Sequence, residues 1–404
     1  MSRSCERLQE FHDQISTDLK RTVKFWVENS HDLEKDGFFN CLGKDGKVYD
    51  TTKNTWLQGR QIWTYSTLIR HVPEVFGTEK DKILDFVEKS AKFLIYKVKD
   101  RETNRCPFST TPTGLAIKYQ RSIYTEIFFT MAMIELYSVT NNDLYKEEGL
   151  KMLDKIIYWT QEDDTELGRT VLPGTTPIQT LAVPMVVLSL GLLPLPEDRM
   201  TKYREIEEKC VKDIMKHIQR NGKVILENVS PDGTELPGSI GRLMNPGHAI
   251  ECGWFLLEYA KKSGNSELKQ IALDKFIMGA FESGWDAKHQ GLFYFLDVDG
   301  WSPTQLEWDM KLWWPHTEAL IAFLMAYDQT QDKKYLDLFE KVFDYCYQHF
   351  VDKENGEWFG YLNRQGDVTH TFKGGPWKGC FHVPRCLMMC QLILKKLLKK
   401  ETDT

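Results

Sequence analysis

The sequence predicts an all-α protein, an (α/α)6 barrel in which six helical hairpins close into a single toroidal domain over residues 1–404. Three observations predict this fold. One order of elements recurs six times, the second helix of each repeat is apolar on nearly every side, and neither end of the chain carries an obvious polar repeat. A helix that is apolar on all sides is buried. An open superhelix needs polar capping repeats at its ends, so we favour a closed ring.

Each repeat is expected to contain a solvated outer helix, a short β-hairpin and a buried inner helix. Apolar residues that recur every three or four positions predict the outer helices, at residues 5–28, 79–99, 142–162, 201–220, 266–282 and 332–350. Short apolar segments that meet a Gly-containing turn predict the hairpins, at residues 37–46, 106–114, 168–174, 222–233, 291–300 and 356–366. The inner helices are expected at residues 56–69, 123–137, 181–193, 249–260, 320–327 and 383–397.

The bulk composition argues against a nucleic-acid-binding or membrane protein. The net charge is −6 and the basic residues are scattered, whereas nucleic-acid binding requires a basic stripe. The most apolar stretch, residues 180–196, is broken by two prolines and a glycine and is too short to span a bilayer. Nine cysteines without framework spacing are typical of free thiols in a reducing compartment, and no apolar leader follows the first residues. We therefore expect a cytoplasmic protein.

Histidines recur at one level of the predicted ring. His248, His316 and His382 stand at or just before the starts of three inner helices, and Arg60 stands at the equivalent point of the first inner helix. A single histidine at such a position is more often a capping residue, but three at one level indicate a shared polar site at the mouth of the ring. The positive end of a helix dipole favours the neutral imidazole, which can act as a base.

These residues suggest inversion of a carbon atom next to a carbonyl. His248 and His382 are the candidate catalytic pair, one removing a proton and the other returning it on the opposite face. Arg60 would stabilise the enediolate oxygen, because its guanidinium remains charged. Glu251 could orient His248 or act on a sugar ring oxygen, and Glu318 could protonate or hold a substrate hydroxyl. Either acid could instead be a dipole-favoured residue in a first helical turn.

No phosphate-binding loop and no metal-ligand spacing occur in the sequence, so we expect a mechanism without a metal. Three other functions remain open. A glycoside hydrolase on the same toroid could use Glu251 and Glu318 as its two carboxylates, although the two histidines would then have no task. The chain could instead be a protein-binding module that sequesters a protease, or an epimerase of unacylated sugars.

Four Trp- and Gly-rich blocks of the chain match a known family. They are Trp56–Gln61, Leu236–Gly238 with Asn245–His248, Pro303–Trp308 with Lys311–His316, and Lys373–Arg385. These blocks resemble the animal N-acylglucosamine 2-epimerase family, whose members are also called renin-binding proteins. The resemblance extends from about residue 8 to about residue 395, which is nearly the whole chain.

The resemblance implies an (α/α)6 barrel homodimer that interconverts N-acetylglucosamine and N-acetylmannosamine in sialic acid metabolism. It places the essential arginine of the family at Arg60, its histidine pair at His248 and His382, and its acid at Glu318. Positions that contact sugar in the related cellobiose epimerases fall on Glu251 and Trp377. The matching blocks further assign Trp314, His316 and Arg385 to substrate binding.

The resemblance also implies properties that the residues themselves do not indicate. Members of the family are activated by ATP, which they do not consume, and the animal members bind renin. A leucine zipper has been associated with renin binding, but here the region from Val186 to Leu195 is broken by Gly191 and Pro194, so we do not expect a coiled-coil dimer. Cys380 lies two residues before His382. We expect its alkylation to block the site by crowding that histidine, although a packing role is equally open.

Overall fold

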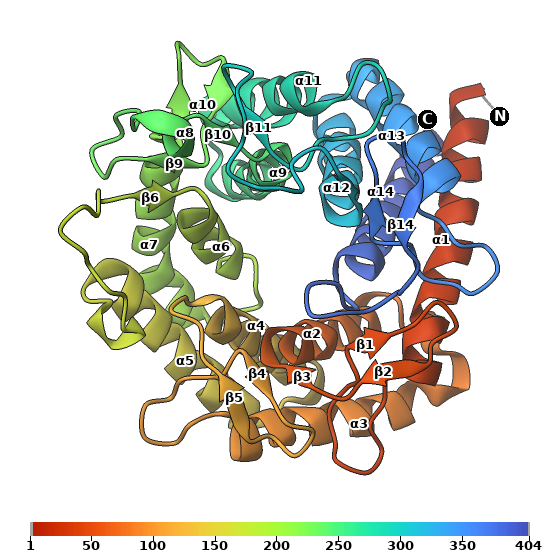
Figure 1. Ribbon diagram of the computed structural model, residues 1–404. Coiled ribbons are helices and arrows are strands. Elements are labelled where there is room, and N and C mark those ends of the chain that lie inside the picture. Colours follow the sequence, from red (N-terminus) through yellow and green to blue (C-terminus); the bar gives the residue numbers. More distant parts are fainter. Residues whose placement is uncertain (1–2, 403–404) are drawn as a thin grey trace.

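Six inner helices surround the axis of a ring in the computed structural model, which describes residues 3–402 (Figure 1). They are α2 (Thr55–His71), α4 (Tyr124–Thr140), α6 (Ala182–Leu190), α9 (Pro246–Ser263), α12 (Trp313–Thr330) and α14 (His382–Thr402). Each packs against the next, and α14 packs against α2, so the inner ring is closed. The predicted (α/α)6 barrel is confirmed.

An outer layer of helices covers the inner ring, one outer unit to each inner helix. The outer helices are α1 (Arg3–Asn29), α3 (Lys80–Phe93), α5 (Asp143–Gln161), α7 (Glu197–Met215), α13 (Lys333–His349) and the continuous run α10 (Ser266–Ile271), η4 (Ala272–Gly279) and α11 (Ala280–Gly284). Four short helical segments complete the set, namely η1 (Pro73–Glu79), η2 (Leu94–Val98), η3 (Thr165–Leu167) and α8 (Gly238–Gly241). Because α1 packs on α14, the two ends of the chain meet.

Short antiparallel strands connect neighbouring repeats. Four pairs lie within one repeat, and three of them are β1 (Cys41–Leu42) with β2 (Val48–Asp50), β7 (Ile218–Gln219) with β8 (Val224–Ile225), and β13 (Tyr361–Leu362) with β14 (Val368–His370). A strand that immediately precedes an inner helix pairs instead with the next repeat. These pairs are β3 (Lys53–Asn54) with β4 (Ser109–Thr110), β6 (Gln179–Thr180) with β9 (Asn228–Val229), β10 (Leu243–Met244) with β11 (Leu296–Asp297), and β12 (Lys311–Leu312) with β13. The remaining strand, β5 (Ala116–Lys118), pairs with β4.

Two of the six predicted hairpins are wrong. Residues 168–174 contain no strand, and residues 291–300 contain only β11, whose partner is β10 of the preceding repeat. In the first of these segments Gly168 adopts a left-handed backbone conformation, with φ of 67°, and Pro173 has no N–H to donate to a ladder. An apolar segment beside a glycine turn therefore neither ensures that a strand forms nor identifies the partner of that strand.

One hydrophobic core extends around the ring from Leu8 to Leu397. Helices α2 and α4 approach closely at Gly59, where an added Cβ would stand 2.5 Å from the carbonyl oxygen of Phe128. All nine cysteines are buried and none forms a disulfide. Within residues 3–402, no helix combines the length and the apolar character that a membrane crossing requires.

Three buried lysine–aspartate pairs recur at equivalent places in the first, fifth and sixth repeats. Lys53 Nζ lies 2.8 Å from Asp32, Lys311 Nζ lies 3.2 Å from Asp286, and Lys373 Nζ lies 2.9 Å from Asp352. Each aspartate also accepts hydrogen bonds from backbone N–H groups two and three residues further along the chain. Each pair therefore fixes the turn after an outer helix to the segment that precedes an inner helix.

We expect the substitution Lys53→Met to lower the free energy of unfolding by about 3–5 kcal/mol, because it leaves the buried carboxylate of Asp32 without its cation. The double variant Lys53→Met/Asp32→Asn removes that charge and keeps a carbonyl acceptor for the turn, so it should recover part of the loss. Urea denaturation followed by circular dichroism measures both. An unchanged midpoint in the single variant would show that this pair does not stabilise the fold.

Candidate active site

A cavity of about 590 Å³ opens where the inner helices begin. Four of the residues predicted from sequence at this level lie in its wall, namely Arg60, His248, Glu251 and His382. The cavity is otherwise lined mainly by aromatic side chains, which include the predicted Trp314 and Trp377. Both candidate catalytic histidines thus face one shared space.

His248 occupies the first turn of α9, where Pro246 is favoured because a first-turn proline has no N–H that needs a partner. The side chain of the N-cap residue Asn245 accepts a hydrogen bond from the backbone N–H of His248 at 3.0 Å. The imidazole Nδ1 lies 3.0 and 3.1 Å from the two carboxylate oxygens of Glu227. With Nδ1 donating to this carboxylate, Nε2 remains available to act on a bound ligand.

The sequence analysis missed Glu227, which lies between β8 and β9, far from His248 in sequence. Its backbone N–H donates to Leu243 and its carbonyl accepts from Leu181, so it is held between the starts of two inner helices. Burial lowers the pKa of His248, but the charge of Glu227 and its hydrogen bond outweigh burial and raise that pKa above its usual value. The Glu227 carboxylate therefore favours the protonated form of His248, which is opposite in direction to the effect predicted from the helix dipole.

His382 is the first residue of α14, and its Nδ1 lies 2.8 Å from the carboxylate of Glu318. Burial, followed by the nearby guanidinium groups of Arg60 and Arg385, holds the pKa of His382 well below its usual value. His382 is thus neutral at physiological pH, as the sequence analysis predicted. The two histidines consequently have opposite protonation preferences.

Glu318 is fully buried behind His382 and is not part of the cavity wall. Its carboxylate accepts hydrogen bonds from Trp254 Nε1 at 2.9 Å and Arg385 Nη2 at 2.6 Å, in addition to the contact with His382. The prediction that Glu318 acts directly on a substrate hydroxyl is therefore wrong, because its carboxylate does not reach the cavity. Glu318 orients His382 and stabilises the imidazolium that forms when this histidine takes up a proton.

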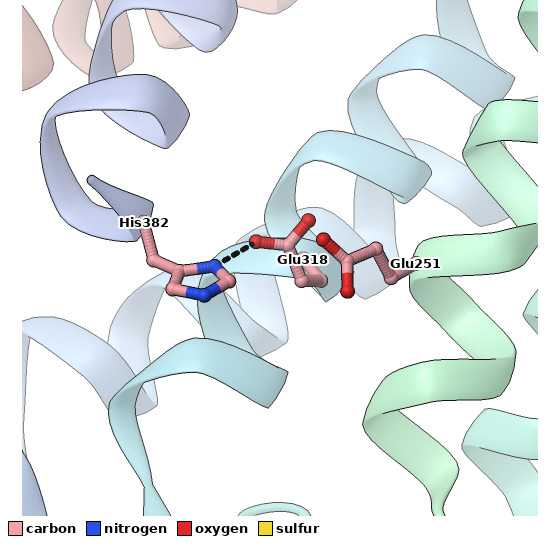
Figure 2. Close-up of side chains that lie close together, drawn as sticks. All are labelled: Glu251, Glu318 and His382. Atoms are coloured by element: carbon pink, nitrogen blue, oxygen red, sulfur yellow. Dashed lines mark hydrogen bonds and ion pairs between the residues drawn. The ribbon is translucent and has the colours of Figure 1, made fainter. Parts of the chain in front are cut away.

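Glu251, Glu318 and His382 form the cluster shown in Figure 2, with one ligand atom of each within 4.8 Å of the others. Such a set could hold a divalent cation. Arg385 Nη2 already lies 2.8 Å from Glu251 and 2.6 Å from Glu318, so a metal ion would have to displace the guanidinium. Glu251 consequently contacts Arg385, whereas His248 is oriented by Glu227.

Arg60 projects from α2 with its guanidinium against three aromatic rings. The distances from its Cζ to the ring centroids are 4.2 Å for Trp56, 4.2 Å for Phe128 and 4.6 Å for Phe381. Its buried Nε has no hydrogen-bond partner among the described residues. Burial, with the charge of Arg385, lowers the pKa of Arg60 to about 9, so the group remains mostly charged at neutral pH. Arg60 can therefore present an unengaged cation to an oxygen of a ligand.

Trp314 lies close to both histidines, with its ring centroid 5.1 Å from that of His248 and 6.0 Å from that of His382. Trp377 is 56% exposed and forms the rim of the cavity. Tyr294, Glu307, Tyr361 and His370 also line the wall, and the sequence analysis did not select them. They come from the loops between helices, where no periodic pattern indicates which side chains face inward.

Two predicted site residues lie elsewhere. His316 is fully buried outside the cavity wall, where its Nδ1 donates to the Leu312 carbonyl at 2.6 Å and its Nε2 accepts from the Leu292 N–H at 2.9 Å. The prediction that His316 binds substrate is therefore wrong. Cys380 is also buried outside the wall, and burial raises the pKa of its thiol well above the usual value. Direct alkylation of this thiol is disfavoured, since only a thiolate is strongly nucleophilic.

Comparison with known proteins identifies the family of this chain. The profile of the family described as N-acylglucosamine 2-epimerase (GlcNAc 2-epimerase) matches residues 37–386. The chain is 49% identical to the N-acylglucosamine 2-epimerase of Mus musculus over 403 residues, which cover 99% of this chain and 96% of that protein.

Two solved structures share the fold. Cellobiose 2-epimerase from Bacillus thermoamylovorans B4167 has a TM-score of 0.77 at 20% identity and covers 96% of this chain and 99% of its own. A D-mannose isomerase has a TM-score of 0.80 at 17% identity and covers 95% and 98%. Because the family profile spans most of the sequence and the mouse relative matches it almost end to end, the chain belongs to the N-acylglucosamine 2-epimerase family of carbohydrate epimerases.

Proposed function

We propose that this protein interconverts N-acetyl-D-glucosamine and N-acetyl-D-mannosamine by moving a proton at C2 of the open-chain sugar. One observation carries the proposal: His248 and His382 line one cavity, each with a carboxylate on Nδ1 and with opposite protonation preferences. An inversion by two bases requires one partner that can take up a proton and another that can supply one.

The C2–H bond is acidic because it adjoins the C1 aldehyde of the open-chain form. Neutral His382 is suited to remove this proton through Nε2, and Glu318 then stabilises the resulting imidazolium. The negative charge moves to the C1 oxygen, giving an enolate in place of the predicted enediolate, since C2 carries nitrogen. The unengaged guanidinium of Arg60 is suited to stabilise that oxygen.

Protonated His248 is suited to return a proton to C2 from the opposite face. The pair then holds its single proton on the other histidine, which is the state that the reverse reaction requires. The equilibrium constant between the epimers does not depend on pH, so kcat/KM in the two directions must follow the same pH profile. Activity therefore depends on the total number of protons that His248 and His382 carry together, and not on which of the two carries the proton at the start.

The contacts of Arg385 argue against a glycosidase. Such an enzyme needs one carboxylic acid and one carboxylate across the scissile bond. Here one guanidinium nitrogen binds both Glu251 and Glu318, and Glu318 has no access to the cavity. Neither group is placed to protonate a leaving sugar, whereas both histidines have a task in the epimerisation.

Family resemblance alone supports four further proposals, which are activation by ATP without its consumption, a homodimer, a cytoplasmic location and binding of renin. The predicted zipper region contributes only α6, which ends at Leu190 and packs into the inner ring. Activation is tested by epimerisation rates with and without ATP, and the homodimer by light scattering. The location is tested by microscopy of a tagged chain, and renin binding by a pull-down with renin. An unchanged rate, a monomeric mass, a non-cytoplasmic signal or no capture would each remove one proposal.

We expect His248→Asn and His382→Asn each to lower the epimerisation rate by about 10²–10⁴, the usual contribution of a general acid or base. Proton NMR of N-acetylglucosamine in deuterium oxide measures this directly, because the wild-type product carries deuterium at C2. Either variant can still exchange the C2 proton of the epimer that faces its remaining base. A near-normal rate in one variant would remove that histidine from the mechanism.

Glu227→Gln should move the alkaline limb of the kcat/KM profile to lower pH. His248 must be protonated in the active pair, and its raised pKa means that this form is lost as pH rises through that value. Without the carboxylate of Glu227, burial lowers the pKa of His248 and only the charge of Glu251 opposes it. Glu227→Asp, which retains the charge, should restore much of the alkaline limb. An unshifted limb in Glu227→Gln would show that Glu227 does not set the protonation of His248.

Arg60→Met keeps an apolar contact with Trp56 and Phe128 but removes the donor. We expect kcat to fall by about 10²–10³ with a smaller change in KM, because the charge on the C1 oxygen develops only as the proton leaves. Arg60→Lys keeps a cation and should lose less. Steady-state kinetics on both epimers measures the effect, and a change confined to KM would mean that Arg60 only binds substrate.

A further inference from the structure

One segment at the mouth of the ring is longer in the sixth repeat than its counterparts elsewhere. In the first and fifth repeats a single residue separates the buried lysine, Lys53 or Lys311, from the inner helix that follows. In the sixth repeat residues 374–381 lie between the equivalent Lys373 and the start of α14. This inserted segment contains no helix or strand, so its shape depends on contacts with its surroundings.

The ammonium group of Lys378 ties the inserted segment to a buried acceptor. Lys378 is fully buried, and its Nζ donates to the carboxylate of Glu357 at 2.7 Å and to the carbonyl of Lys373 at 3.0 Å. The Glu357 side chain is buried as well, and it accepts from Trp26 Nε1 at 2.5 Å and from the backbone N–H of Trp358 at 2.9 Å. The acceptor is therefore itself held in place.

The inserted segment forms part of the aromatic surroundings of Arg60. Phe381, its last residue, has its ring centroid 4.6 Å from Arg60 Cζ. The ring of Trp56 lies 4.2 Å from the same carbon atom. Trp56 Nε1 donates to the carbonyl of Pro376 at 3.2 Å, and the ring centroids of Trp56 and Trp377 are 5.7 Å apart. Two of the three rings against the guanidinium thus belong to this segment or contact it.

We infer that Lys378 is a positioning residue for Arg60. Its ammonium group holds the inserted segment in the shape that keeps the rings of Trp56 and Phe381 against the guanidinium. The inference rests on the role of Arg60 in the proposed epimerisation and adds the residue that determines where this guanidinium lies. Lys378 is outside the walls of both cavities that Arg60 lines, so it affects the reaction only through the groups that it positions.

The direction of the Arg60 side chain depends strongly on these rings. Its buried Nε has no hydrogen-bond partner among the described residues, so the ring contacts take the place of a hydrogen bond there. A misplacement of about 1 Å in a reacting group can cost about 10²-fold in rate. The effect should be seen mainly in kcat, because the C1 oxygen acquires its charge only as the proton leaves.

Lys378→Met removes the ammonium group and keeps most of the apolar stem of the side chain. We expect kcat for N-acetylglucosamine to fall by about 10–10²-fold with a smaller change in KM. The urea midpoint should fall too, because the Glu357 carboxylate loses its cation. Lys378→Met/Glu357→Gln removes that charge and should recover much of the midpoint. Its kcat should nevertheless stay low, because the contact that holds the inserted segment is still missing.

A double-mutant cycle with Arg60→Met shows whether Lys378 acts through Arg60. In the Arg60→Met background, Lys378→Met should lower kcat by less than about twofold, since the group that it positions is gone, whereas independent effects would multiply. Arg70→Met is the matched control. It removes the cation from another buried carboxylate, that of Glu135, near the opposite end of α2. It should lower the urea midpoint without changing kcat.

The outcomes separate the inference from the proposed function. A low kcat in both Lys378 variants, together with its near disappearance as an effect in the Arg60→Met background, supports the inference. A normal kcat in Lys378→Met, or a kcat that recovers with the midpoint, would overturn it and leave the proposed function intact. Multiplying effects in the cycle would also overturn it, because Lys378 would then act by another route. No exchange of the C2 proton by the wild-type protein would instead contradict the proposed function.

Discussion

The carboxylate of Glu318 is the interaction on which the site geometry depends. It lies on α12 and accepts hydrogen bonds from Trp254 on α9 and from His382 and Arg385 on α14, so it joins three consecutive inner helices. A fully buried carboxylate is costly unless it is both hydrogen-bonded and neutralised. Arg385 provides the charge, and His382 provides a donor whose orientation is then fixed. The same buried contacts thus connect α9, α12 and α14 and place the imidazole of His382.

The difference between the two histidines arises from their neighbours rather than from the helix ends they share. Both lie in the first turn of an inner helix and both have a carboxylate on Nδ1. His382 additionally faces the charges of Arg60 and Arg385, which oppose its protonation, while Glu318 is already neutralised by Arg385. His248 is closer to uncompensated negative charge from Glu227. The ring therefore shifts the pKa values of two chemically identical side chains in opposite directions.

The repeat pattern predicted the fold because the spacing of apolar residues along a helix shows which faces of that helix are buried. The pattern could also predict at which end of the ring the site lies, since residues at the starts of the inner helices converge at one end of the ring. It could not predict which side chains face inward. α12 begins at Trp313, earlier than predicted, which makes His316 its fourth residue, whereas His248 is the third residue of α9 and His382 the first of α14. His316 instead stacks on Tyr345 of the outer helix α13. Glu227 was unpredictable for a different reason, because backbone hydrogen bonds to Leu181 and Leu243, which no periodic pattern in the sequence indicates, place it beside His248.

The third repeat departs from the common pattern, and its inner helix borders the candidate active site. Its inner helix, α6, has only 9 residues and is the shortest of the six. Proline and glycine limit this helix in sequence, and the same repeat lacks the predicted hairpin. A second cavity of about 300 Å³ lies against this short helix, with Ala182, Val186 and Ser189 in its wall, and it shares Arg60, His248 and Glu251 with the larger cavity. Space beside the site is therefore left open where the repeat departs from its pattern, and substitutions on α6 can change that space without replacing the histidines on α9 and α14.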